Sequence, residues 1–140
     1  MLGAAVEALA LLGDVTAVAP VRTSAPVGPS LRRYANGAAL LESALEPQEL
    51  LAALKRIERR FGRTTRGQRW SSRVIDLDIV LWDGGCFGAP GLLVPHRLFR
   101  TRDFVLAPAM AIAPAWRDPV SGLSVRQLHA RLTSPRPLPR

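Results

Sequence analysis

The chain has 140 residues, a length that fits one domain with a real hydrophobic core. Apolar residues make up 48% of it, which excludes a disordered protein by composition. The formal net charge is +8, and nearly all the positive charge is arginine, because Lys55 is the only lysine. Arginine pairs well with phosphate oxygens. The composition therefore fits a nucleotide or nucleic-acid ligand, or simply a GC-rich genome.

Cysteine content and hydropathy indicate the cellular compartment of the protein. Cys86 is the only cysteine, which excludes an internal disulfide and gives no sign of an oxidising compartment. The apolar stretch from Leu2 to Leu12 is too short to cross a membrane and is interrupted by Glu7. No basic region precedes it, as a signal peptide would require. We therefore expect a soluble cytoplasmic protein with no membrane partner.

The first third of the chain predicts one helix and two strands. Residues 3–12 are rich in Ala and Leu and predict a helix that stops at Gly13. Residues 15–21 and 34–43 predict strands. The segment 24–29 between them contains Pro and Gly and predicts a loop.

A second helix is predicted to begin at Pro47, where the missing N–H costs nothing, and to end at Gly62. Its apolar stripe is Leu50, Leu54, Ile57 and Phe61.

Residues 73–82 predict a strand that carries two aspartates. Apolar residues at alternate positions form a face for the core: Ile75, Leu77, Ile79 and Leu81. Asp76 and Asp78 lie side by side on the other face, which Val80 and Trp82 partly bury. Two adjacent carboxylates repel one another, and a cation between them relieves the repulsion. Oxygen ligands with room for water suit Mg²⁺, which usually arrives with a phosphate. A solvent-facing polar pair is the alternative.

The last part of the chain predicts a loop over residues 84–91 and one more helix. Ser124 and Gln127 form a predicted capping box, and the helix runs to about Leu132. The tail 133–140 is rich in Pro and Arg and is expected to be loose. Strands and helices mix without a regular alternation, which indicates an α+β fold.

Further cations and aromatic side chains surround the aspartates in sequence. An arginine-rich segment with Trp70 precedes them, and Val94-Pro95-His96 follows, with Arg100, Arg102 and Phe104 just beyond. Trp70 and Phe104 could hold a flat ring between them. Trp70 in a plain core and His96 in an ordinary turn are the alternatives. Arg100 is expected to face solvent.

The ordered motifs resemble those of the 6-hydroxymethyl-7,8-dihydropterin pyrophosphokinases of folate biosynthesis. The resemblance covers roughly residues 3–132. The motifs are Pro26-x-Gly28-Pro29, Tyr34-x-Asn36, Ile57-Glu58-x-x-x-Gly62-Arg63, Arg69-Trp70-x-x-Arg73-x-x-Asp76-Leu77-Asp78-Ile79, Val94-Pro95-His96 and Arg102-x-Phe104-Val105-Leu106-x-Pro108.

The resemblance implies a ferredoxin-like antiparallel sheet with helices packed on it, over residues 1–132. It implies an ATP-dependent diphosphotransferase that moves diphosphate to the pterin's hydroxymethyl group and releases AMP. Two Mg²⁺ ions are expected on Asp76 and Asp78, with ATP as co-substrate. No specific nucleic-acid partner is expected.

The resemblance also assigns the site. Arg63, Arg73, Asp76 and Asp78 are the expected catalytic residues. The expected ATP-binding residues are Glu58, Arg66, Trp70, Arg73, Ile79, His96 and Arg102. The expected pterin-binding residues are Ser24, Ala25, Val27, Tyr34, Asn36, Trp70 and Phe104.

The chain departs from the family pattern at its start, where a first strand with a Gly-Ser-Asn-Leu-Gly turn is absent. A missing central strand would leave backbone groups unpaired, and we therefore expect lower stability. The unpaired edge could also recruit a second copy, so monomer and dimer both stay open.

One alternative function is a degenerate, inactive member that binds nucleotide or a protein partner. Another is a nucleic-acid-binding module, for which no motif is recognised.

Overall fold

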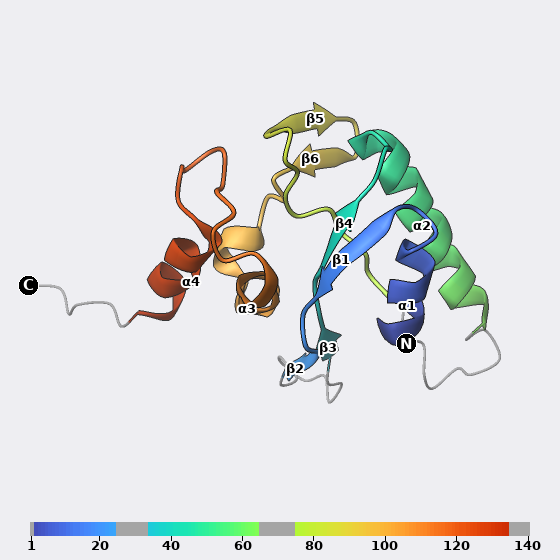
Figure 1. Cartoon of the computed structure of the whole chain (residues 1–140), viewed down its shortest axis with the longest axis horizontal. Helices are drawn as coiled ribbons and strands as arrows, with labels where there is room; N and C mark the ends of the chain where they lie inside the picture. Colours follow the sequence, from blue (N-terminus) through green and yellow to red (C-terminus); the bar gives the residue numbers. More distant parts are fainter. Residues whose placement is uncertain (1, 25–33, 65–74, 135–140) are drawn as a thin grey trace, which may run out of the picture. The chain divides into compact units, whose positions relative to one another are not determined.

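The computed structural model describes residues 2–24, 34–64 and 75–134 (Figure 1). The chain divides into two compact units. Unit 1 comprises Met1–Thr16 and Leu41–His96, and unit 2 comprises Ala17–Leu40 and Arg97–Arg140. Helices and short two-stranded sheets make up the described chain, which agrees with the predicted α+β class.

Helix α1 spans Leu2–Leu9 and is shorter than predicted, because the next turn is irregular. Its end is fastened by Ser43 Oγ, which donates a hydrogen bond to the Leu12 carbonyl at 2.8 Å. Gly13 follows, and a Cβ there would lie 2.1 Å from the Glu42 carbonyl oxygen. The chain therefore needs glycine at this close approach of two backbone segments.

Helix α2 spans Pro47–Thr64 and begins where predicted. The backbone N–H of Glu46 donates to Glu49 Oε1 at 3.1 Å, which satisfies one donor at the helix start. Leu54 and Ile57 of the predicted stripe are buried. The helix runs past Gly62, so the predicted end was wrong; glycine weakens a helix but does not forbid it.

The strand predicted over residues 15–21 ends early, at Val18, and a further strand that was not predicted begins at Arg22. The strand predicted over residues 34–43 is broken in two. Pro20 lies between β1 and β2, and Gly37 lies between β3 and β4. Proline lacks the N–H that a ladder needs, and glycine loses the most freedom in a strand. The strands are β1 (Asp14–Val18), β2 (Arg22–Ser24), β3 (Tyr34–Asn36) and β4 (Ala39–Glu42). β1 pairs with β4, and β2 pairs with β3 in antiparallel fashion.

The predicted strand over residues 73–82 was wrong for its described part. Residues 75–82 form no ladder with any strand of the described chain, where the six strands pair among themselves. The alternation of burial persists, because Ile75 is buried while Asp76 and Asp78 are exposed. Side-chain burial thus gives this segment a strand-like pattern without a ladder to any described strand.

The predicted loop over residues 84–91 is partly a hairpin. β5 (Phe87–Ala89) pairs antiparallel with β6 (Leu92–Val94). Gly91 has a φ of +78° in the turn, a conformation that favours glycine. The loop composition indicated the turn but not the short strands beside it.

Unit 2 contains the helices α3 (Asp103–Ile112) and α4 (Val125–Thr133). The capping box predicted at Ser124 and Gln127 is present. The core of unit 2 includes the fully buried side chains of Phe99, Leu106 and Val125. Helix α3 packs against α4 and against both β2 and β3.

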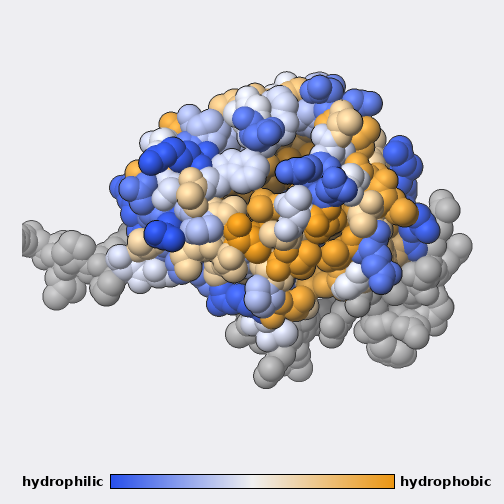
Figure 2. Space-filling view, in the orientation of Figure 1, coloured by the Kyte–Doolittle hydropathy of each residue, from blue (hydrophilic) through white to orange (hydrophobic). Residues whose placement is uncertain are grey.

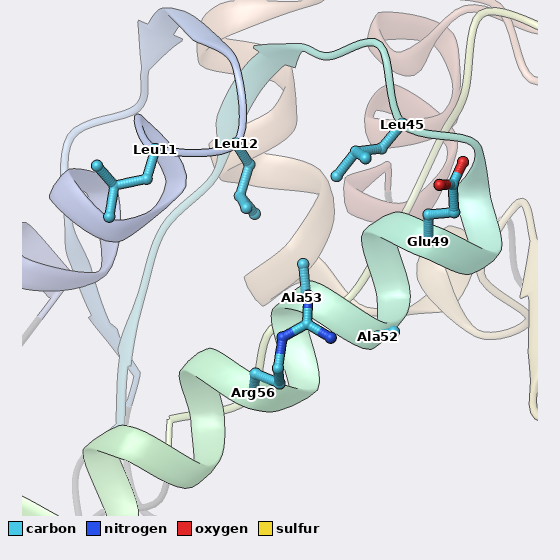
Figure 3. Close-up of a pocket in the computed structure, with 7 residues that line it drawn as sticks. All are labelled: Leu11, Leu12, Leu45, Glu49, Ala52, Ala53 and Arg56. Carbon is cyan, nitrogen blue, oxygen red and sulfur yellow. The ribbon is translucent and has the colours of Figure 1, made fainter.

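On the face drawn in Figure 2, hydrophobic side chains gather over α1 and the neighbouring β1. Unit 1 has a pocket of about 470 Å³ near this region, lined by Leu11, Leu12, Leu45, Glu49, Ala52, Ala53 and Arg56. Figure 3 shows Leu12 and Leu45 pointing into the space beside α2. None of the residues predicted to act on ATP or pterin lines this pocket.

Among the described helices, none is long and apolar enough to cross a membrane.

Candidate active site

The aspartate pair is the centre of the predicted site and lies in unit 1. Asp76 and Asp78 are both exposed, on alternate positions of the extended segment. Ile79, predicted to contact ATP, is half-buried on the opposite side of the alternation. The two carboxylates are therefore open to a ligand, while their neighbours anchor the segment.

His96 fastens the aspartate segment on one side. Its backbone N–H donates to the Val80 carbonyl at 2.9 Å. Its Nε2 lies 3.9 Å from Asp78 Oδ2, a loose pairing that is ionic only when the imidazole is protonated. His96 follows Pro95, whose peptide bond with Val94 is cis. His96 was predicted to bind ATP, and the structure brings its imidazole beside Asp78.

Glu58 of α2 reaches the same segment from the other side. Its Oε2 accepts a long hydrogen bond of 3.5 Å from the backbone N–H of Leu77, between the two aspartates. Its Oε1 lies 2.9 Å from Lys55 Nζ. The Glu58 side chain is only 12% exposed, so the Lys55 ammonium compensates a largely buried charge.

The pKa of Lys55 is raised above its ordinary value. Its hydrogen-bonded contact with Glu58 is the largest cause, and the charges of Asp78 and Asp76 add to it against the opposing effect of burial. No role was predicted for Lys55 from the sequence. Its spacing of three residues from Glu58 on a predicted helix was the available signal.

Unit 2 holds residues predicted to bind pterin. Ser24 of β2 pairs with Tyr34 of β3, and Arg22 pairs with Asn36, so three of those residues lie in one ribbon. The Arg22 guanidinium lies 3.6 Å from the Asp103 carboxylate at the start of α3. This contact joins the ribbon to the helix that carries Phe104.

Arg102 and Phe104 flank the first residue of α3. The Arg102 guanidinium lies 5.6 Å from the centre of the Phe104 ring, within the range of a cation–π contact. Phe104 as a whole residue is 44% exposed, so a ligand can reach it. Between them, Asp103 also lies 3.3 Å from His129 Nε2 of α4.

Arg100 was expected to face solvent, and this expectation was wrong. Arg100 donates two hydrogen bonds to Asp118, of 2.5 and 2.8 Å, and Asp118 is fully buried. These bonds, with others from Ser121 and the Val120 N–H, hold the pKa of Asp118 well below its usual range. The pair is structural, because a buried carboxylate without a cation is costly.

Several predicted residues lie outside the described part of the chain: Ala25, Val27, Arg66, Trp70 and Arg73. Arg63 lies in the last turn of α2.

Comparison with known proteins decides the family. The family model described as 7,8-dihydro-6-hydroxymethylpterin-pyrophosphokinase matches residues 1–114. The chain belongs to this family. Three pyrophosphokinase relatives, all named 2-amino-4-hydroxy-6-hydroxymethyldihydropteridine pyrophosphokinase, are 36–42% identical to it.

The pyrophosphokinase relatives differ in how much of their length the chain covers. The Synechocystis protein is 41% identical over 72% of this chain and 51% of its own length. The Pseudomonas aeruginosa protein is 42% identical over 75% of this chain and 65% of its own length. The Methylorubrum extorquens protein is 36% identical over 94% of this chain and 84% of its own length. The chain thus spans between half and two thirds of the first two relatives.

Proposed function

We propose that this chain transfers diphosphate from ATP to the hydroxymethyl group of 6-hydroxymethyl-7,8-dihydropterin and releases AMP. One observation carries the proposal: in a member of this family, the exposed Asp76 and Asp78 lie on a segment held by Glu58 and His96. A pair of open carboxylates on a fastened backbone is suited to binding a cation with a polyphosphate.

The donor chemistry of the aspartate pair fits Mg²⁺. Asp76 and Asp78 supply hard oxygen ligands at the surface, where water and phosphate oxygens can complete an octahedron. Within the described ranges, no group of three or more His, Cys, Asp and Glu side chains is placed to hold a metal ion. That agrees with a metal ion most of whose ligands are water molecules and substrate oxygens. When bound, Mg²⁺ would neutralise charge on the phosphate oxygens.

We assign the remaining ATP contacts to cations and apolar side chains that flank the aspartates in sequence. Arginine guanidinium groups stabilise charge on the transferred group, because they donate paired hydrogen bonds to phosphate oxygens. His96 can donate to a phosphate or to Asp78, and half-buried Ile79 offers an apolar contact to the base. The proposed ATP-binding set is Glu58, Arg66, Trp70, Arg73, Ile79, His96 and Arg102, with Arg63 and Arg73 acting on the transferred group.

The pterin is assigned to the β2–β3 ribbon and the start of α3. Asn36 can both donate to and accept from the edge of a heterocycle, and Phe104 offers an open ring face for stacking. The proposed pterin-binding set is Ser24, Ala25, Val27, Tyr34, Asn36, Trp70 and Phe104. A ferredoxin-like arrangement of a domain over residues 1–132 is part of this proposal, supported by family membership and the α+β composition.

The direct test is AMP formation from ATP and 6-hydroxymethyl-7,8-dihydropterin, followed with purified protein and Mg²⁺. We expect AMP and the pterin diphosphate in equal amounts, and neither without Mg²⁺. ATP binding with no AMP under any metal condition would instead support an inactive family member.

A further inference from the structure

Lys55 is the only lysine of the chain, and it lies one helical turn before Glu58 on α2. Its Nζ contacts Glu58 Oε1 at 2.9 Å, and the other oxygen of that carboxylate accepts the Leu77 N–H. Leu77 is the residue between Asp76 and Asp78. A single carboxylate group therefore separates the ammonium from the backbone that carries both aspartates.

Among the described residues around this point, carboxylates outnumber the ammonium. Three carboxylates, those of Glu58, Asp76 and Asp78, share one nearby ammonium in unit 1. Glu58 links the ammonium to the backbone between the aspartates, because its two oxygens contact Lys55 Nζ and the Leu77 N–H. The charges of Asp78 and Asp76 also contribute to the raised pKa of Lys55. These four side chains together therefore carry a net charge of −2, whereas the three carboxylates alone would carry −3. The Lys55 side chain is half-exposed, and its contact with Glu58 holds its ammonium beside the carboxylate.

We propose that Lys55 is a fixed counter-charge at the Asp76–Asp78 pair, which weakens binding of a divalent cation alone and stabilises the protein when the cation is absent. The inference rests on the proposed function, because it takes the two aspartates as the Mg²⁺-binding residues. A cation entering by itself meets the positive charge of the ammonium. A cation entering with ATP brings phosphate charge that offsets this repulsion. Lys55 thereby makes occupation of the site by the metal depend more strongly on nucleotide.

The test is the affinity of the full chain for Mn²⁺ without nucleotide, measured from the electron paramagnetic resonance signal of the free ion. Lys55→Met removes the charge and keeps the length of the apolar stem. We expect it to bind Mn²⁺ about three- to tenfold more tightly, because a unit charge within roughly 10 Å of a divalent ion repels it appreciably even through water. Lys55→Arg retains the charge and should bind Mn²⁺ as the parent does.

The matched control is Arg60→Met, which removes one positive charge from an exposed position on another face of α2. It should change Mn²⁺ affinity by less than about twofold, because solvent and salt screen an exposed charge on another face of the helix. The gain in Lys55→Met should also shrink as salt is raised. In chelator, Lys55→Met should melt below the parent. A purely structural role would lower the melting temperature without tightening Mn²⁺ binding, so only the two effects together support the proposal.

Asp78→Asn separates failure of this inference from failure of the proposed function. If Asp78→Asn weakens Mn²⁺ binding by more than about tenfold while Lys55→Met leaves it unchanged or weaker, the counter-charge role is refuted and the metal site stands. If Asp78→Asn leaves Mn²⁺ binding unchanged, the aspartates do not hold the ion, and both proposals fail. Lys55→Gln provides a second neutral variant should Lys55→Met fold poorly.

Discussion

Asp76 and Asp78 are the side chains on which the proposed reaction depends most directly. Replacing either with Ala removes a carboxylate from the proposed cation site and leaves the packing of Ile75 untouched, because both aspartates are exposed. We expect AMP formation to fall by at least about a thousandfold, a loss of several kcal/mol in transition-state stabilisation. Circular dichroism should show an intact fold. Asp83→Ala is the control, since Asp83 is exposed in the next turn. Activity within tenfold of the parent in Asp76→Ala or Asp78→Ala would contradict the assignment of these aspartates to the metal.

The Arg100–Asp118 pair gives a prediction about stability. Arg100→Met leaves a fully buried carboxylate without its cation, and such losses cost about 3–5 kcal/mol. Urea unfolding at neutral pH measures the loss. Arg100→Met combined with Asp118→Asn should recover part of it, because the uncompensated charge is gone; a double variant less stable than Arg100→Met would contradict this account.

The same pair predicts how the parent responds to acid. Since the pKa of Asp118 is lower in the folded state than its ordinary 3.8, its ionised form stabilises the protein at neutral pH. That stabilisation is lost as the pH falls below the ordinary value and towards the lower folded-state pKa. We expect the parent to lose unfolding free energy over this acidic range, and Asp118→Asn to lose less. Equal acid dependence of the two proteins would count against the lowered pKa.

Asn36 tests the placement of the pterin. Asn36→Ala removes a side chain that can pair with a heterocycle edge, a loss of about 1–3 kcal/mol when the pocket is closed. We expect weaker pterin binding and nearly unchanged ATP binding in separate calorimetric titrations. An equal loss for both ligands, or no loss for either, would argue against the assignment.

Among the helices and strands, the features predicted correctly are those that depend on residues close together in the sequence. The start of α2 at Pro47 and the capping box of α4 depend on residues within one turn, and both were predicted. Strand pairing depends on distant partners, which the sequence of residues 75–82 cannot supply. Its alternating burial was predicted correctly, and its ladder was not. The same limit applies to the site: the motif predicted His96 as an ATP-binding residue, whereas its contact with Asp78 and that of Lys55 with Glu58 required the structure.

Helix α4 offers a test of the capping box itself. Ser124 Oγ accepts the Gln127 N–H at 3.1 Å, and Gln127 Oε1 accepts the Ser124 N–H at 2.9 Å. Ser124→Ala should cost about 1 kcal/mol in the free energy of unfolding, because the Gln127 N–H loses its side-chain acceptor. Gln127→Glu keeps an acceptor and adds negative charge at the helix start, so it should be neutral or slightly stabilising. Equal destabilisation by both changes would show that the box is not the cause.

Across the whole molecule, the charge of +8 makes weak binding to nucleic acid an expected side property. Such binding depends on counterion release, so its affinity should fall steeply as salt rises. The proposed reaction instead depends on particular side chains such as Asp78, and Asp78→Asn should abolish AMP formation while leaving oligonucleotide binding unchanged or slightly stronger. Fluorescence anisotropy with an arbitrary oligonucleotide and the AMP assay, run on the same variants over a salt series, separate the two properties. Tight oligonucleotide binding that resists salt, in a protein that forms no AMP, would favour a nucleic-acid-binding module instead.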